Sequence, residues 1–194
     1  MVTARSHIWL LGATAVILLV TGGCQRGKKE VPESKLSSQE LEHFSLRQFS
    51  DRVSLEVTGE TAEMTADQKT AIVQQPGFSL KSADSLIEVR TGGEGRAEIR
   101  FSPQRQQMEA AILEGKITVT QKALQDKKVL MEATCQKLTY EDREKVLLME
   151  GNPVITRDHN SFSGEKIYYY WTENRIEIKG NVKVLVYPEK TQAP

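Results

Sequence analysis

The chain has 194 residues, which suits one domain of ordinary size. Its 26 basic side chains balance 26 acidic ones, so net charge gives no reason to expect a nucleic-acid partner. The two cysteines, Cys24 and Cys135, are too few for a disulfide framework, and no cysteine–histidine pair has the spacing of zinc ligands. We therefore expect no metal and no cofactor.

The first 24 residues are predicted to be a signal or membrane-anchor segment. Residues 8–20 (IWLLGATAVILLV) form an apolar run that is shorter than the roughly 20 residues of a membrane-spanning helix and is typical of a signal-peptide core. The run ends in VTGGC, which resembles the lipobox of bacterial lipoproteins and implies lipid attachment at Cys24. An uncleaved anchor and a cleaved, secreted form are the alternatives. All three place the rest of the chain outside the cytoplasm.

Residues 25–40 (QRGKKEVPESKLSSQE) are polar and contain Pro32, which predicts a tether. From Leu41 to residue 188 the dominant pattern is alternation of apolar and polar residues, which predicts strands. Short polar turns such as TADQKT (65–70) separate these segments. We expect one all-β domain over residues 41–188 and a tail over 189–194. The predicted strands cover 44–49, 53–57, 86–89, 97–101, 116–120, 129–133, 145–149, 175–179 and 181–186.

Three segments are nearly alike: EGKITVT (114–120), EGNPVIT (150–156) and KGNVKVL (179–185). Aligning Gly151 with Gly180 also places Tyr140 on Tyr169. Such self-similarity indicates a repeat architecture. Each unit is predicted to be a strand, a turn and a strand, followed by a glycine that permits a bend or bulge before the next strand.

Stacked units of this kind bury one face of every strand. The predicted inward residues are mostly medium-sized aliphatics, and their pattern suits both a closed core and an open groove for acyl chains. Ala111 belongs to this inward set. The candidates for lining a lipid groove are Leu55, Val57, Ile99, Leu113, Ile117, Val119, Leu147, Met149, Ile155, Ile176, Ile178, Val182 and Val184.

Residues 133–155 and 164–186 share an alternating strand, a tyrosine with an acidic turn, an aliphatic strand and Gly-Asn followed by valine, and residues 41–49 add an alternating strand at the start of the domain. They resemble the periplasmic lipopolysaccharide-transport β-jellyroll family. A membrane anchor, a tether and one such domain resemble its anchored, LptC-type component more than its soluble, LptA/OstA-like bridge. The resemblance implies an open β-jellyroll built from repeated short antiparallel strands.

The resemblance also implies a non-enzymatic carrier. Such a protein receives lipopolysaccharide from an inner-membrane ABC transporter and passes it along the jellyroll groove towards the outer membrane. Its implied partners are the lipid A acyl chains, the transporter subunits and a soluble bridge protein of the same fold. Edge strands would make the protein contacts, with residues 181–187 facing the bridge and 44–49 facing the transporter. The implied location is the periplasmic face of the inner membrane, with the outer membrane as the alternative because Gln25 follows Cys24.

Two other functions remain open from the sequence. A structural β-repeat lipoprotein of the cell envelope would use the same repeats without lipid cargo. A carbohydrate-active enzyme outside the cytoplasm would need a carboxylate pair or metal site, which the sequence does not suggest. His7, His43 and His159 have no partnered nucleophile, and TGGEG (91–95) is interpreted as a hairpin tip. We therefore expect no catalytic residue.

Overall fold

The computed structural model describes residues 39–50, 53–104 and 107–187, and the regular elements in these ranges are all β-strands. The predicted signal segment with Cys24, nearly all of the predicted tether and the predicted tail lie outside these residues. Across the described ranges, no helix is long and apolar enough to cross a membrane. The strands are β1 (Gln39–Ser50), β2 (Val53–Met64), β3 (Thr70–Gln74), β4 (Gly77–Lys81), β5 (Ser85–Thr91), β6 (Arg96–Phe101), β7 (Met108–Ala123), β8 (Val129–Glu141), β9 (Val146–Glu150), β10 (Val154–Arg157), β11 (Asn160–Ser163), β12 (Lys166–Tyr170), β13 (Arg175–Lys179) and β14 (Lys183–Leu185).

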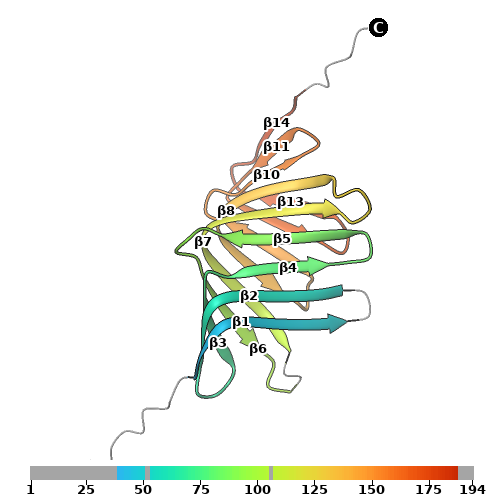
Figure 1. The fold of residues 1–194 in the computed structure, drawn as a ribbon. Helices are drawn as coiled ribbons and strands as arrows, with labels where there is room; N and C mark the ends of the chain where they lie inside the picture. The colour runs from blue at the N-terminus through green and yellow to red at the C-terminus, as the bar shows by residue number, and fades with distance from the viewer. Residues whose placement is uncertain (1–38, 51–52, 105–106, 188–194) are drawn as a thin grey trace, which may run out of the picture. The chain divides into compact units, whose positions relative to one another are not determined.

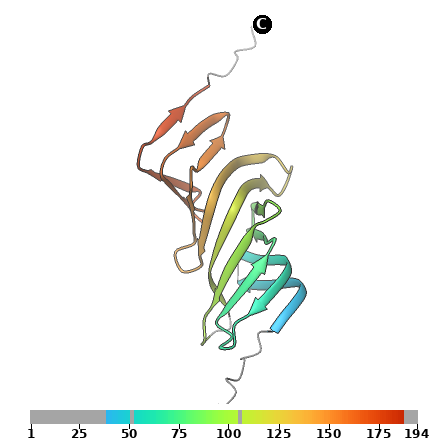
Figure 2. The same cartoon turned by 90° about the vertical axis from the view of Figure 1, so that its left-hand side faces the viewer.

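These strands pair antiparallel throughout and follow two paths of hydrogen-bonded neighbours, which we call the first and second layers. The first layer runs β1–β2–β4–β5–β7–β8–β10–β11–β14 and is seen face on in Figure 1. The second runs β1–β2–β3–β6–β7–β8–β9–β12–β13. The long strands β1, β2, β7 and β8 belong to both layers. Figure 2 shows the stack advancing from β1 (blue) to β14 (red). The predicted all-β jellyroll is confirmed.

The chain crosses between the layers at bends that we call corners. The three repeated glycines, Gly115, Gly151 and Gly180, all lie at corners and have φ values of 123°, 74° and 70°, where a side chain is disfavoured. At Gly115 the register of β7 against β8 shifts between Glu114 and Ile117, which is a β-bulge. The predicted unit is therefore a hairpin in one layer followed by a glycine corner into the other.

Successive corners are joined through the backbone. The amide of Gln75 donates to the carbonyl of Gly95 at 2.8 Å, and the amide of Gly92 donates to the carbonyl of Lys116 at 2.8 Å. Further along, the amide of Gln136 donates to the carbonyl of Gly151 at 3.2 Å. The corners therefore form one continuous row, and the opposite ends of the strands, which we call the open ends, carry the hairpin turns.

The segment TGGEG (91–95) is not the hairpin tip that its composition suggested. Strand β5 pairs with β4 and β7, whereas β6 pairs with β3 and β7, so the segment is a corner between layers. A Cβ atom on Gly115 would lie only 3.2 Å from the Cα of Gly95, which shows how closely neighbouring corners pack. Glycine-rich composition marks a sharp bend but does not show which strands the bend connects.

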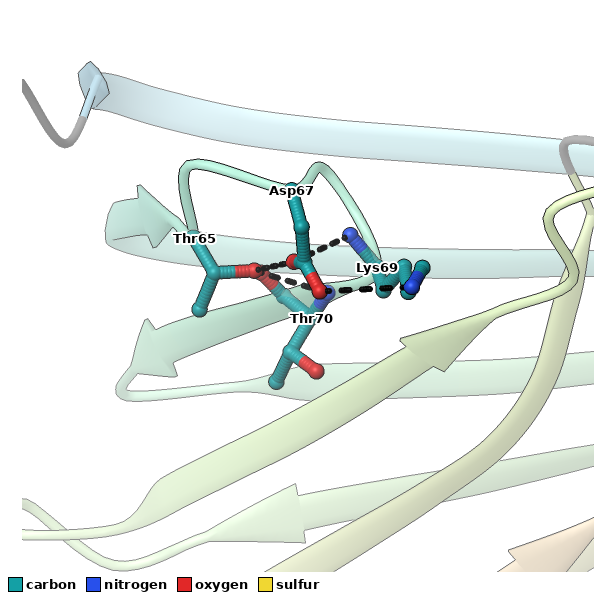
Figure 3. Close-up of polar contacts among 4 residues, drawn as sticks. All are labelled: Thr65, Asp67, Lys69 and Thr70. Atoms are coloured by element: carbon teal, nitrogen blue, oxygen red, sulfur yellow. Dashed lines mark hydrogen bonds and ion pairs between the residues drawn. The ribbon is translucent and has the colours of Figure 1, made fainter. Parts of the chain in front are cut away.

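The predicted turn TADQKT (65–70) is an open-end turn between β2 and β3, and side chains close it (Figure 3). The hydroxyl of Thr65 donates to Oδ1 of Asp67 at 2.8 Å, and the amide of Lys69 donates to the same oxygen at 3.1 Å. These two bonds lower the pKa of the Asp67 carboxyl. The amide of Thr70 donates to Oγ1 of Thr65 at 3.1 Å. The turn thus satisfies its own backbone groups.

Candidate functional site

The candidate site is the apolar core between the two layers. Nine of the proposed groove residues are at most 3% exposed and belong to one continuous cluster, whereas Ile176 and Ile178 are partly buried and pack against it. Val182 and Val184 are 52% and 50% exposed. The nine are Leu55, Val57, Ile99, Leu113, Ile117, Val119, Leu147, Met149 and Ile155.

Sequence reasoning missed much of the same cluster. Phe78 and Leu80 lie in β4, and Ile87 and Val89 lie in β5, all at most 3% exposed. The alternation in LIEV (86–89) could have identified the β5 pair. The β4 pair lies within QQPGFSL (74–80), where Gly77 begins the strand. In the first layer the buried face therefore extends from β2 through β4, β5, β7 and β8 to β10.

Two buried tyrosines of the repeat place hydroxyl groups at the rim of this apolar space. The hydroxyl of Tyr140 donates to Oδ1 of Asp142 at 2.6 Å, and burial and that carboxylate both raise the pKa of Tyr140. The hydroxyl of Tyr169 donates to Oε1 of Gln121 at 2.8 Å, and burial raises the pKa of Tyr169. The second bond joins β12 of the second layer to β7 of the first. These two tyrosine contacts thus lie at the open ends and leave the middle of the core apolar.

The chemistry for catalysis is sparse. Burial raises the pKa of the Cys135 thiol to about 12, so this thiol stays protonated and is not a nucleophile. His43 lies within β1 and His159 in the turn between β10 and β11. Among the residues that the structure describes, no group of three histidine, cysteine, aspartate or glutamate side chains could hold a metal ion.

The ends of the stack are edge strands. Within the described ranges β1 pairs only with β2, β13 only with β12, and β14 only with β11. Apolar side chains are exposed at both ends, with Phe49 71% exposed on β1 and Leu185 59% exposed on β14. An unpaired edge presents free amides and carbonyls to which another strand can bind.

The match to known proteins spans most of this domain. Residues 34–175 match the family model described as "LptA/(LptD N-terminal domain) LPS transport protein". A comparison with curated proteins finds no match. Among solved structures, the chain is similar to that of LptH, the LptA-homologous periplasmic component of the lipopolysaccharide transport device from Pseudomonas aeruginosa. The TM-score is 0.53 at 16% identity, covering 69% of this chain and 95% of that one, so this likeness concerns the fold.

The family model covers more than half of the chain and includes the strands from β1 to β12. The structural likeness and the matched sequence agree on the same jellyroll. The chain therefore belongs to the LptA/LptD N-terminal domain family of lipopolysaccharide transport proteins.

Proposed function

We propose that the protein is a non-enzymatic periplasmic carrier that holds the acyl chains of lipopolysaccharide between its two layers. The main support is the continuous aliphatic cluster, which extends from Leu55 in β2 to Ile178 in β13 and reaches both ends of the stack. Transfer of an acyl chain from water into such a space is favourable by roughly 0.8 kcal/mol for each buried methylene. Membership of a lipopolysaccharide transport family supports the same cargo.

The route of entry follows from how the layers are joined. At the corners the backbone itself crosses between them, so they cannot separate there. At the open ends the described contacts between layers are made by side chains, such as the bond from Tyr169 to Gln121. Acyl chains would therefore enter by parting the open ends, and the side chains would close over them.

The edge strands are the proposed contacts through which lipopolysaccharide passes between this domain and its partner proteins. The exposed strand β14 and the residues after it, up to Tyr187, would pair with a soluble bridge protein of the same fold. At the other end β1, with its exposed Leu41 and Phe49, would face the subunits of an inner-membrane ABC transporter. Edge pairing of this kind would extend one apolar space into the next.

The N-terminal segment supports an anchored, LptC-type component. Residues 8–20 and the lipobox-like VTGGC would hold the domain at the membrane, through lipid on Cys24 or through an uncleaved anchor. We favour the inner membrane, with the outer membrane as the alternative. A mass spectrum of the purified protein would distinguish the two anchors, because cleavage before Cys24 with lipid attachment changes the mass at the N-terminus.

Photo-crosslinking in cells that make lipopolysaccharide tests the cargo. A photoreactive amino acid is placed singly at the inward positions Leu113, Met149 and Ile178, with the outward Thr118 and Glu177 as matched controls on β7 and β13. We expect lipopolysaccharide adducts from the inward positions alone. Absence of adducts from folded, anchored protein would contradict the carrier function and favour the structural lipoprotein. The nearly complete burial of the core is the observation that favours this alternative.

A further inference from the structure

A cleft of about 480 Å³ lies at the open ends and receives side chains from both layers. Its walls include residues 82–85 and Gln121 from the first layer, and Trp171, Thr172 and Asn174 from the β12–β13 turn of the second. Volumes of this size hold small molecules or part of a larger ligand. We call it the open-end cleft.

Trp171 gives this cleft an unusual donor. The side chain is only 7% exposed, and its Nε1 is buried without a hydrogen-bond partner among the described residues. An indole N–H can only donate, and buried donors in native proteins are nearly always paired. Its backbone is fixed, because the amide of Trp171 donates to the carbonyl of Lys145 at 3.3 Å. The indole N–H of Trp171 is therefore an unpaired donor among the described residues, and a ligand could supply its acceptor.

The rest of the cleft lining combines polar and apolar side chains. Gln121 is 5% exposed, with its Oε1 accepting from Tyr169 at 2.8 Å and its Nε2 lying 3.4 Å from Oγ of Ser85. Val53 and Leu130 form an apolar part of the wall. A ligand that suits this surface combines a hydrogen-bond acceptor with an alkyl chain.

We propose that the open-end cleft, when the open ends part, binds the carbonyl group at the head of a fatty-acyl chain, with the Nε1–H of Trp171 that is enclosed in the closed form donating to the carbonyl oxygen. This inference rests on the proposed carrier function and assigns one polar contact within it. The alkyl chain then points towards the apolar cluster, which Tyr169 borders through its bond to Gln121. The cleft thus distinguishes an acylated lipid from a plain hydrocarbon chain.

Two matched probes test the carbonyl directly. 1-Lauroylglycerol and 1-O-dodecylglycerol have the same chain length and glycerol head, but only the first contains a carbonyl group. Each is titrated into the full chain in dodecyl maltoside, a detergent without a carbonyl. The readout is the indole N–H signal of Trp171 by nuclear magnetic resonance, assigned with Trp9→Phe, since Trp9 is the other tryptophan.

We expect the ester probe to shift the Trp171 signal and to bind about fivefold more tightly than the ether, as one hydrogen bond provides. Trp171→Phe should remove this preference, whereas Trp9→Phe should keep it. Equal affinity for both probes, no binding of either, or an unmoved Trp171 signal would overturn the proposal. If Trp171→Phe fails to fold by circular dichroism, the comparison of the two probes on the wild-type chain still decides.

The photo-crosslinks separate failure of this site from failure of the carrier. Lipopolysaccharide adducts at Met149 combined with equal probe affinities would reject the carbonyl contact and leave the carrier intact. No adduct at any of Leu113, Met149 and Ile178 would reject the carrier itself, whatever the probes show.

Discussion

Two copies of the repeat, residues 138–155 and 167–184, occupy matching places in the fold but different surroundings. Leu138 and Ile167 are both completely buried, as are their neighbours Tyr140 and Tyr169 to within 1%. After the turn the copies diverge. Met149 is fully buried, whereas its counterpart Ile178 is only partly so.

The difference in burial is largest at Ile155 and Val184. Each of these residues lies four positions after the corner glycine of its copy. Ile155 is 0% exposed and Val184 is 50% exposed. Strand β10 is flanked by β8 and β11, whereas β14 has a described neighbour on one side only. The alternation thus determines which face a side chain takes, while its place in the stack determines whether anything covers that face.

The largest effect should come from placing a charge at the two matching positions. Ile155→Lys buries an unpaired ammonium group and should destabilise the fold by more than about 4 kcal/mol, which prevents folding. Val184→Lys keeps its charge in water and should change stability by less than about 0.5 kcal/mol. Soluble yield and urea denaturation measure both variants. Equal tolerance of the two lysines would show that β10 and β14 are equally exposed in solution.

Truncation of the core side chains should give the next largest difference. Met149→Ala leaves a cavity in a fully buried site and should cost about 3 kcal/mol. Ile178→Ala, at a partly buried site in the edge strand β13, should cost about 1 kcal/mol because water or neighbouring side chains can fill the space. Equilibrium unfolding in urea gives both values. A cost for Ile178→Ala as large as that for Met149→Ala would show that the edge strand β13 is covered as fully as β9.

Alanine substitutions at the corner glycines of the two copies, Gly151 and Gly180, compare how rigid the backbone is at each corner. An alanine at Gly151 would need a left-handed φ and would bring its Cβ to 2.7 Å from Cβ of Gln136, in the long strand β8. We expect Gly151→Ala to cost about 2 kcal/mol. Gly180→Ala meets a similar contact, 2.8 Å to Cβ of Glu165, but this corner leads into the edge strand β14, whose backbone has a described neighbour on one side only and can adjust, so the cost should be about 1 kcal/mol. Thermal unfolding measures the difference, and equal costs would show that both corners are equally rigid.

Much of this fold could be predicted from the sequence because the determining patterns are local. Alternation identified the strands of both repeat copies, and the repeated glycine identified their corners. The family resemblance marked residues 181–187 as an edge strand, but alternation alone placed Val182 and Val184 in the groove, because it does not show whether a neighbouring strand covers that face. Gln121 and Trp171 also escaped notice, since a polar strand residue and a turn residue become buried only through contacts between the layers.

The smallest expected difference concerns the tyrosines of the two copies. Here the substitution in the second copy, at Tyr169, should cost more stability than the one in the first copy, at Tyr140. Removing the hydroxyl in Tyr169→Phe leaves Oε1 of the buried Gln121 without its donor, which should cost about 1 to 2 kcal/mol. In Tyr140→Phe, Asp142 loses the tyrosine hydroxyl but still accepts a hydrogen bond from Nζ of Lys145 at 2.6 Å. The loss of unfolding free energy should therefore be only about 0.5 kcal/mol.

Urea denaturation of both phenylalanine variants measures this difference, and the double variant Tyr169→Phe with Gln121→Leu provides the control. The leucine removes the stranded amide, so it should recover part of the stability lost in the single variant. A cost for Tyr140→Phe equal to or larger than that for Tyr169→Phe would contradict a bond between layers at the open ends. If the order holds, the hydrogen bond from Tyr169 to Gln121 in β7 holds the second copy, which is only partly covered at its edge, against the first layer.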